Sequence, residues 1–225
     1  MSQITISQNT MSVLKNFCTI NSSILIREGS VLKTISVGEN AVAQYTCEEV
    51  FPTTFGIYDL NQFLAGLTLF SNGNTVPTLE FDNSEYVTIK SKGMSVKYYF
   101  SDPEITLKAA PEKNIQFPGA DMEFVLRQEN INALHKANTV YQIPDLKFHS
   151  IGGSVILSLV DKENETSNVF SLEIPGDNTG EYELFMKMEN IRLFPGDYNV
   201  KISSKMITEW RHSTLDLTYY IALEP

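Results

Sequence analysis

The side chains best suited to acid–base or metal chemistry at neutral pH are the three histidines, His135, His149 and His212. None of them has a cysteine or a carboxylate at the spacing of a metal-ligand set, so we expect no metal site and no cofactor. Serine, histidine and aspartate are all present, but no nucleophile motif orders them as a hydrolytic triad requires. These residue types therefore do not predict catalysis.

Two short segments could in principle bind phosphate or calcium. Gly152-Gly153 lacks the Gly-Lys-Ser/Thr of a phosphate loop and is typical of a hairpin turn. The acidic run Asp161-Lys162-Glu163-Asn164-Glu165 lacks the central glycine of a calcium loop and indicates a solvated turn. We therefore expect a protein that is not an enzyme.

Composition favours a soluble globular protein, since 42% of the residues are apolar and 20% are charged. Cys18 and Cys47 are the only cysteines, a pattern typical of reduced residues in a cytosolic protein. The segment from Met1 to Thr5 lacks the regions of a signal peptide, and no run approaches the roughly 18 apolar residues that span a bilayer. We expect no membrane association.

The elements that position these residues follow a repeated order. Leu14–Asn21 and Leu134–Tyr141 lie about 120 residues apart, and each predicts an amphipathic helix ending at a threonine before a β-branched residue. In both halves strands, a second short helix and further strands follow. We expect two duplicated domains, 1–108 and 109–225, with a linker at about 101–119 that contains three prolines.

Apolar periodicity predicts helices at 8–20, from Asp59 onwards, at 128–141 and at 187–194. Asp59 is a capping residue, while Pro144 and Pro195-Gly196 end the last two helices. Alternating patterns predict strands at 23–26, 31–37, 41–47, 78–81, 86–90, 95–100, 121–126, 147–149, 154–160, 169–174, 198–202, 209–211 and 215–223. Many strands with a few short helices indicate an α+β fold.

Charge is distributed unevenly over these elements. The chain has a net charge of −10, which argues against non-specific binding to nucleic acid. The predicted helices nevertheless carry a small positive excess, from Lys15, Lys136, Lys187 and Arg192 against Asp59, Glu129 and Glu189. This pattern has two interpretations: an ordinary solvated face, or a surface shared by helices of several subunits that faces a polyanion.

Four short segments form a collinear set: Leu14-Lys15-Asn16-Phe17, Ile57-Tyr58-Asp59-Leu60-Asn61, Phe194-Pro195-Gly196-Asp197-Tyr198 and Tyr220-Ile221-Ala222-Leu223-Glu224. From about Thr10 to Glu224 they resemble the DNA polymerase sliding clamp, or processivity factor, of T-even-type bacteriophages. The resemblance implies a DNA-clamp fold, with two short helices packed on antiparallel sheets in each duplicated domain. It also implies a closed trimeric ring around duplex DNA, lined by the helices.

In such a ring, the resemblance implies DNA-facing roles for Lys15, Lys136, Lys187, Arg192 and His135. Lys15 matches a lysine of the family's first helix, and Arg192 matches a basic residue of its last helix. His135 and Asn138 fall where the family places arginines, a departure that thins the basic lining.

The family joins its subunits head to tail, through an edge strand of each domain. The matching segments here contain the expected interface residues Val96, Tyr98, Tyr99, Phe100, Val169, Phe170 and Leu172. Aromatic edge strands left exposed would otherwise favour aggregation. The residues alone leave open a second interpretation, in which Tyr98 to Phe100 belong to the core.

Partners follow from the same resemblance. A C-terminal peptide of the DNA polymerase is expected in a pocket formed by Ile105, Leu107, Tyr220, Ala222 and Pro225. These residues could instead only close the second domain's sheet. An ATP-dependent clamp-loader complex and late transcription factors are further implied partners, in the cytoplasm of the infected bacterial host. The alternative function is a non-catalytic duplicated interaction module or virion structural protein.

Overall fold

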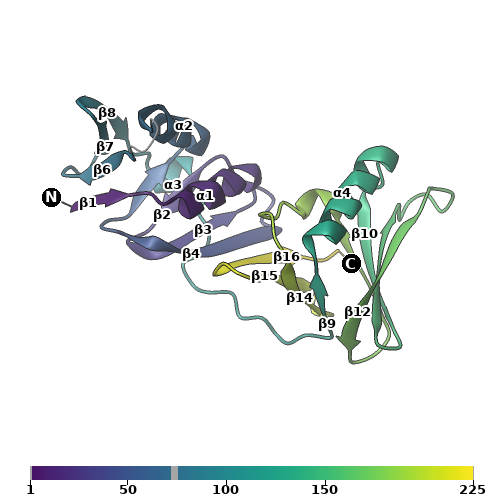
Figure 1. Cartoon of the computed structure of the whole chain (residues 1–225). Coiled ribbons are helices and arrows are strands. Elements are labelled where there is room, and N and C mark those ends of the chain that lie inside the picture. Colours follow the sequence, from purple (N-terminus) through teal and green to yellow (C-terminus); the bar gives the residue numbers. More distant parts are fainter. Residues whose placement is uncertain (1, 72–75, 225) are drawn as a thin grey trace. The chain divides into compact units, whose positions relative to one another are not determined.

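The structure is a computed structural model and describes residues 2–71 and 76–224. The chain divides into two compact units, Met1–Glu112 and Lys113–Pro225, each with its own helices and antiparallel strands (Figure 1).

The described residues of the first unit form a four-stranded sheet, two strand pairs and three helices. The helices are α1 (Gln8–Ile20), α2 (Leu60–Phe70) and the single-turn α3 (Pro103–Thr106). The sheet has the order β1-β6-β7-β8, made by β1 (Ser2–Thr5), β6 (Thr78–Phe81), β7 (Tyr86–Ser91) and β8 (Met94–Tyr99). β2 (Ile24–Ile26) pairs with β5 (Phe55–Ile57), and β3 (Gly29–Ile35) pairs with β4 (Ala41–Phe51).

Local sequence explains the two main helices of this unit. Ser7 caps α1 by accepting a hydrogen bond from the Thr10 backbone N–H, and Asp59 caps α2 by accepting one from Gln62 at 2.9 Å. The apolar stripes of both helices are buried, and α1 and α2 lie side by side. The predicted positions of both helices are confirmed.

The second unit is built on one antiparallel sheet with the order β13-β10-β11-β12-β9-β14-β15-β16. Its strands are β9 (Met122–Leu126), β10 (Asp145–Ile151), β11 (Ser154–Val160), β12 (Phe170–Asn178), β13 (Tyr182–Lys187), β14 (Tyr198–Ser203), β15 (Ile207–His212) and β16 (Leu217–Ala222). The helix α4 (Gln128–Tyr141) packs on β11 and β12, and its predicted range is confirmed. Trp210, Tyr198, Tyr219 and Phe148 are the largest fully buried side chains of the unit.

The expected helix at 187–194 is wrong. Lys187 is the last residue of β13, and only a one-turn 3₁₀ helix at Met188–Asn190 follows. Met186 and Met188 are both buried, so their apolar character fits a strand as well as a helix. Pairing with β10, in which Lys187 lies opposite Asp145, decides for the strand. Up to Glu224, the second unit therefore contains one α-helix instead of the expected two.

Candidate functional site

Two of the candidate DNA-facing cations lie on α-helices, one in each unit. Lys15 is exposed on α1, and Lys136 is exposed on α4. They are the only lysines or arginines in α1, α2 and α4, and the remaining polar surface of these helices is rich in asparagine and glutamine. Each helix face is therefore nearly neutral, with one exposed cation on α1 and one on α4.

His135 is half-buried on α4, and this burial lowers the pKa of its imidazole. Desolvation disfavours the charged imidazolium, so the ring is neutral at pH 7. His135 can therefore offer a hydrogen bond but adds no positive charge to the face of α4.

The last two candidates for DNA contact do not lie on an α-helix. Lys187 Nζ lies 2.6 Å from Asp145 Oδ1 and 3.6 Å from Glu224 Oε2, and hydrogen bonding to Asp145 raises its pKa. Arg192 lies in the loop after the 3₁₀ turn, where its Nε donates to the Glu189 carbonyl at 3.0 Å. An ammonium that is ion-paired with two carboxylates is a poor partner for phosphate. Among the five residues expected to face DNA, Lys187 is therefore the least suited to contact it.

Sequence reasoning missed one further exposed cation, Arg127, at the N-cap position of α4. Arg127 precedes the first turn and lies outside the predicted helix 128–141. It was therefore not counted among the helical charges that suggested a DNA-facing surface. Its position next to the helix was nevertheless readable from the sequence.

The expected interface residues of the first unit divide into two groups. Tyr98 and Phe100 pack inside the unit: the Tyr98 ring lies 5.1 Å from Phe63 and the Phe100 ring 4.9 Å from Phe55. Val96 and Tyr99 are exposed, at 42% and 62%. β8 pairs with β7 on one side, and among the described residues no strand pairs with its other side.

The expected interface residues of the second unit lie at a second open edge. Phe170 and Leu172 are half-buried on β12, and Val169, one residue before the strand, is 63% exposed. β12 pairs with β11 from Phe170 to Pro175, whereas β9 pairs with it only at Gly176–Asn178. Among the residues that the structure describes, one side of β12 is therefore unpaired between Phe170 and Pro175.

The expected peptide-pocket residues come from both units. Ile105 is 82% exposed on α3, whereas Leu107 is half-buried beside Gly56. Tyr220 and Ala222 belong to β16, half-buried and exposed respectively, and Pro225 lies outside the described residues.

Side chains of the first unit hold the segment that follows α3. Asn21 Nδ2 donates to the Lys108 carbonyl at 3.3 Å, and Arg27 donates to the Ala110 carbonyl at 2.9 Å. The buried Lys33 donates to the Glu112 carbonyl at 2.7 Å. The carbonyls of alternate residues, Lys108, Ala110 and Glu112, thus accept hydrogen bonds from the first unit. These bonds hold this part of the predicted linker in an extended conformation against that unit.

Within the described parts of the chain, no group of histidine, cysteine, aspartate and glutamate residues could hold a metal ion. No helix there is long and apolar enough to cross a membrane.

Comparison with known sequences points to one class of protein. A family model for the DNA polymerase processivity factor matches residues 7–104. The chain is 29% identical to the sliding clamp of Vibrio phage KVP40, over 97% of this chain and 98% of that protein. It is 27% identical to the sliding clamp of Enterobacteria phage T4, over 89% and 87%.

Solved structures agree on the fold. The proliferating cell nuclear antigen of Entamoeba histolytica has a TM-score of 0.71 at 12% identity, over 96% of this chain and 94% of that chain. The A. fulgidus PCNA bound to the C-terminal region of FEN-1 has a TM-score of 0.72 at 13% identity, over 100% and 99%.

The fold is thus that of a DNA sliding clamp, a class of non-catalytic processivity factors. Within this class, the chain is similar over most of its length to the sliding clamps of T-even-type bacteriophages. The resemblance drawn from the four segments is confirmed, as are the α+β clamp fold and the expectation of a protein that is not an enzyme.

Proposed function

We propose that three copies of the chain close into a ring around duplex DNA and tether the replicative polymerase to it. The main observation in support of this proposal is that two strand edges are open, β8 in the first unit and β12 in the second. Two different edges on one chain favour head-to-tail association, and such contacts close into a ring when the rotation permits.

A ring solves a physical problem of processive synthesis. Phosphate contacts strong enough to prevent dissociation would also resist sliding, because they dominate affinity on DNA. Encirclement retains the clamp with weak contacts, which the nearly neutral helix faces supply. Three copies carry about −30 in total, three times the net charge of −10, so their outer surface repels DNA.

For the weak contacts we assign Lys15 and Lys136, with Arg192 and Arg127 in supporting positions and His135 as a neutral hydrogen-bonding group. Lys187 is left out of this set because Asp145 and Glu224 hold its ammonium.

Retention on DNA of different shapes tests encirclement. After loading, the clamp is expected to stay on nicked circular DNA and to leave when one cut linearises the circle. Equal retention on both forms would contradict the ring and favour the alternative of a duplicated interaction or virion protein. Light scattering supplies the control for assembly, with a species near three times 25.3 kDa expected.

The polymerase peptide site is assigned to Ile105, Leu107, Tyr220, Ala222 and Pro225. Exposed apolar anchors such as Ile105 are the residues on which peptide docking depends. The A. fulgidus PCNA, which has the same fold, binds the C-terminal region of FEN-1, and this complex supports peptide binding as the mode of recruitment.

Substitution tests the peptide site better than truncation. Removing Leu223–Pro225 would also remove Glu224, whose N–H donates to the Phe185 carbonyl at 2.8 Å. Ile105→Ser is expected to weaken binding of the polymerase C-terminal peptide about ten-fold, or roughly 1.4 kcal/mol. Val50→Ser, at another exposed apolar residue, is the matched control. If the peptide bound the Ile105→Ser and intact proteins with equal affinity, the peptide site would have to lie elsewhere on the protein.

An ATP-dependent clamp loader must open such a ring, and late transcription factors are a further class of partner. The implied site of action is the cytoplasm of the infected bacterium, where phage DNA is replicated.

A further inference from the structure

The connector, residues 101–112, follows β8 to the end of the first unit and carries Ile105 and Leu107 of the proposed peptide site. Every residue between α3 and β9 is described, and the chain there forms neither helix nor strand (Figure 1). Surface coil of this kind is usually mobile, and a mobile segment loses conformational entropy when a partner orders it. The contacts of the connector decide whether this cost arises.

The start of the connector is anchored on β5. Ser101 N donates a hydrogen bond to Gly56 O at 3.0 Å, and the two residues form an antiparallel bridge. An added Cβ on Gly56 would lie 2.5 Å from Ser101 O and 2.6 Å from Leu107 Cδ1. Because Ser101 O is a main-chain atom, it could move away only together with the connector. This close approach of two backbone segments therefore depends on glycine at position 56.

The turn that carries Ile105 is held by its own hydrogen bonds. Asp102 Oδ1 accepts a hydrogen bond from Glu104 N at 2.9 Å, and the Asp102 carbonyl accepts one from Thr106 N at 3.1 Å. Pro103 occupies the first turn of α3, where its ring restricts φ to a helical value. Ile105 lies within this turn and is 82% exposed. An exposed apolar side chain is thus presented on an ordered turn.

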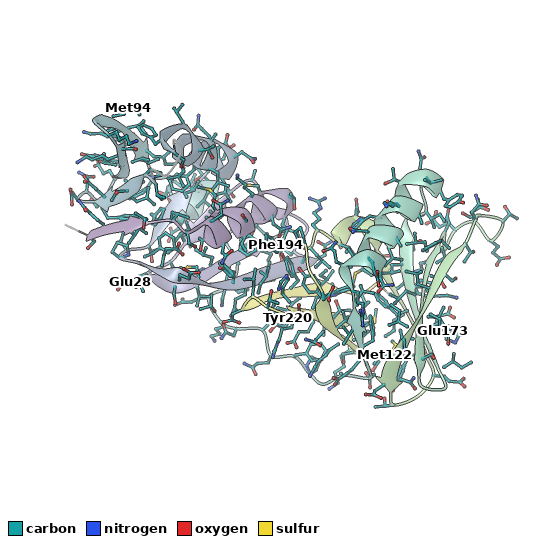
Figure 2. All side chains as sticks on the ribbon, in the orientation of Figure 1. Glu28, Met94, Met122, Glu173, Phe194 and Tyr220 are labelled. Carbon is teal, nitrogen blue, oxygen red and sulfur yellow. The ribbon has the colours of Figure 1, made fainter. Side chains whose placement is uncertain are left out.

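The end of the connector is held by polar side chains from separate parts of the first unit. Asn21, Arg27 and Lys33, which donate to its carbonyls, come from the end of α1, the β2–β3 turn and β3. Glu28, labelled in Figure 2, follows Arg27 in that turn. Asn21 and Lys33 are buried, and Ala110 is only 4% exposed. These contacts fix the main chain of the connector.

Lys33 makes its contact with the connector despite a cost. Its Nζ donates to Glu112 O at 2.7 Å and to Pro111 O at 3.5 Å, and the residue is only 8% exposed. Burial and the positive charge of Arg27 lower the pKa of Lys33, and the charge of Glu112 offsets only part of this effect. A buried ammonium needs acceptors that replace its water. Detachment of the connector would remove such acceptors from Lys33 and is therefore disfavoured.

We propose that the connector is a preformed docking segment, whose conformation Gly56, Arg27 and Lys33 set before a peptide binds. This inference rests on the proposed peptide site and adds three positioning residues, which act on the peptide only through the connector. A preformed segment binds without first ordering its own backbone. If an anchor is lost, the docking-competent fraction of the protein falls, and the Kd rises by the same factor.

Binding kinetics distinguish a positioning residue from a contact residue. Lys33→Met keeps an unbranched side chain but removes its donors. If it lowers the docking-competent fraction to about one tenth, the Kd of the polymerase C-terminal peptide rises about ten-fold. Surface plasmon resonance is expected to show this loss in the association rate, with the dissociation rate unchanged, because the bound state is the same. Ile105→Ser, which removes a contact, is expected to raise the dissociation rate instead.

A second variant and a matched control accompany Lys33→Met. Arg27→Met removes the neighbouring anchor and is expected to show the same slower association, which keeps the test available if Lys33→Met disturbs folding. Lys113→Met, at an exposed residue just beyond the connector, removes the same charge by the same substitution. It is expected to leave both rate constants unchanged. Light scattering checks that each variant assembles as the intact chain does.

Hydrogen exchange gives a readout that needs no peptide. The Ser101 and Thr106 amides donate hydrogen bonds within the first unit, so they are expected to exchange slowly in the intact chain. Lys33→Met and Gly56→Ala are each expected to speed their exchange several-fold, while the amides of α1 keep their protection. Rapid exchange of both amides in the intact chain would overturn the preformed connector.

The outcomes separate this inference from the proposed peptide site. If Ile105→Ser left the Kd unchanged, the proposed peptide site itself would be wrong. If Ile105→Ser weakened binding while Lys33→Met and Arg27→Met did not, the site would stand and the positioning role would be overturned. Faster dissociation with unchanged association in the two anchor variants would also overturn it, because that result indicates direct contact with the peptide.

Discussion

At the scale of single residues, Glu49 links a strand to the start of a helix. Its Oε2 accepts a hydrogen bond from Thr10 Oγ1 at 2.6 Å, and its Oε1 accepts one from the Ser7 backbone N–H. Burial alone would raise the pKa of this carboxyl, but the hydrogen bonds from Thr10 and Ser7 outweigh burial and lower it. The charged form of Glu49 therefore stabilises the folded first unit.

Replacing Glu49 by glutamine should lower the free energy of unfolding by about 2 kcal/mol at pH 7, because hydrogen bonds to a charged acceptor are lost. The lowered folded-state pKa means that this stability is present above the ordinary glutamate pKa of about 4.3 and is lost at lower pH. Urea unfolding at pH 7 and near pH 3 is the measurement, with the exposed Glu48→Gln as control. An equal loss for Glu49→Gln at both pH values would contradict a role for the charge.

Gly196 lies in Phe194–Tyr198, one of the four segments that carry the family resemblance, and its role is structural. Its φ is +150°, and an added Cβ would lie 2.0 Å from His212 Nε2. His212 is buried, and its Nδ1 accepts hydrogen bonds from the backbone N–H groups of Thr214 and Leu215 at 3.2 and 3.1 Å. The Phe194–Tyr198 segment therefore wraps a buried imidazole, which explains why only glycine fits at this position.

At the scale of elements, the proposed ring depends on the open edges of β8 and β12. Both edges end in ordered turns or in proline, and both expose apolar side chains beside free backbone groups. An edge of this kind is an aggregation hazard unless another strand covers it.

Tyr99→Glu or Phe170→Glu should convert trimers to monomers at micromolar concentration, because each buries an unpaired charge at the seam, at a cost of several kcal/mol. Light scattering of the variants is the measurement. Val37→Glu, at a 76% exposed residue in the β3–β4 turn, is the control and should leave assembly unchanged. A stable trimer of both seam variants would place the seam on other strands.

At the scale of the whole molecule, a net-acidic chain carries few exposed cations on its helices. Lys15 and Lys136 are exposed, His135 is neutral, and Lys187 is ion-paired. In the proposed ring, contact with DNA would therefore depend on a small number of phosphate contacts and should be weak, as sliding requires.

Replacing Lys15, Lys136 and Arg192 together by alanine should leave trimers intact and flatten the salt dependence of loading. Each lost phosphate contact removes roughly one unit of salt slope. Loading kinetics across a salt series measure the effect. The triple alanine variant of the exposed Lys113, Lys162 and Lys205 has the same net charge and is the control. If both triple variants lost salt dependence equally, net charge alone would be the cause.

The features of this protein that depend on local structure could be predicted from the sequence. α1 and α4 begin and end at the predicted residues, because an apolar stripe and its end signals lie within one segment. β6 and β11 were predicted with the same accuracy from alternation alone. The four collinear segments carried the family resemblance, which needs no knowledge of contacts.

Tertiary structure decided what depends on partners distant in sequence. Pairing with β10 makes Lys187 part of a strand. Its ammonium, predicted from the sequence to face DNA, is instead ion-paired with Asp145 and Glu224. β5 was missed because all three of its residues are buried, which removes the alternation that marks a strand. The open sides of β8 and β12 are likewise a property of the sheet, because a strand's own sequence does not record which of its backbone groups a neighbour has already bonded.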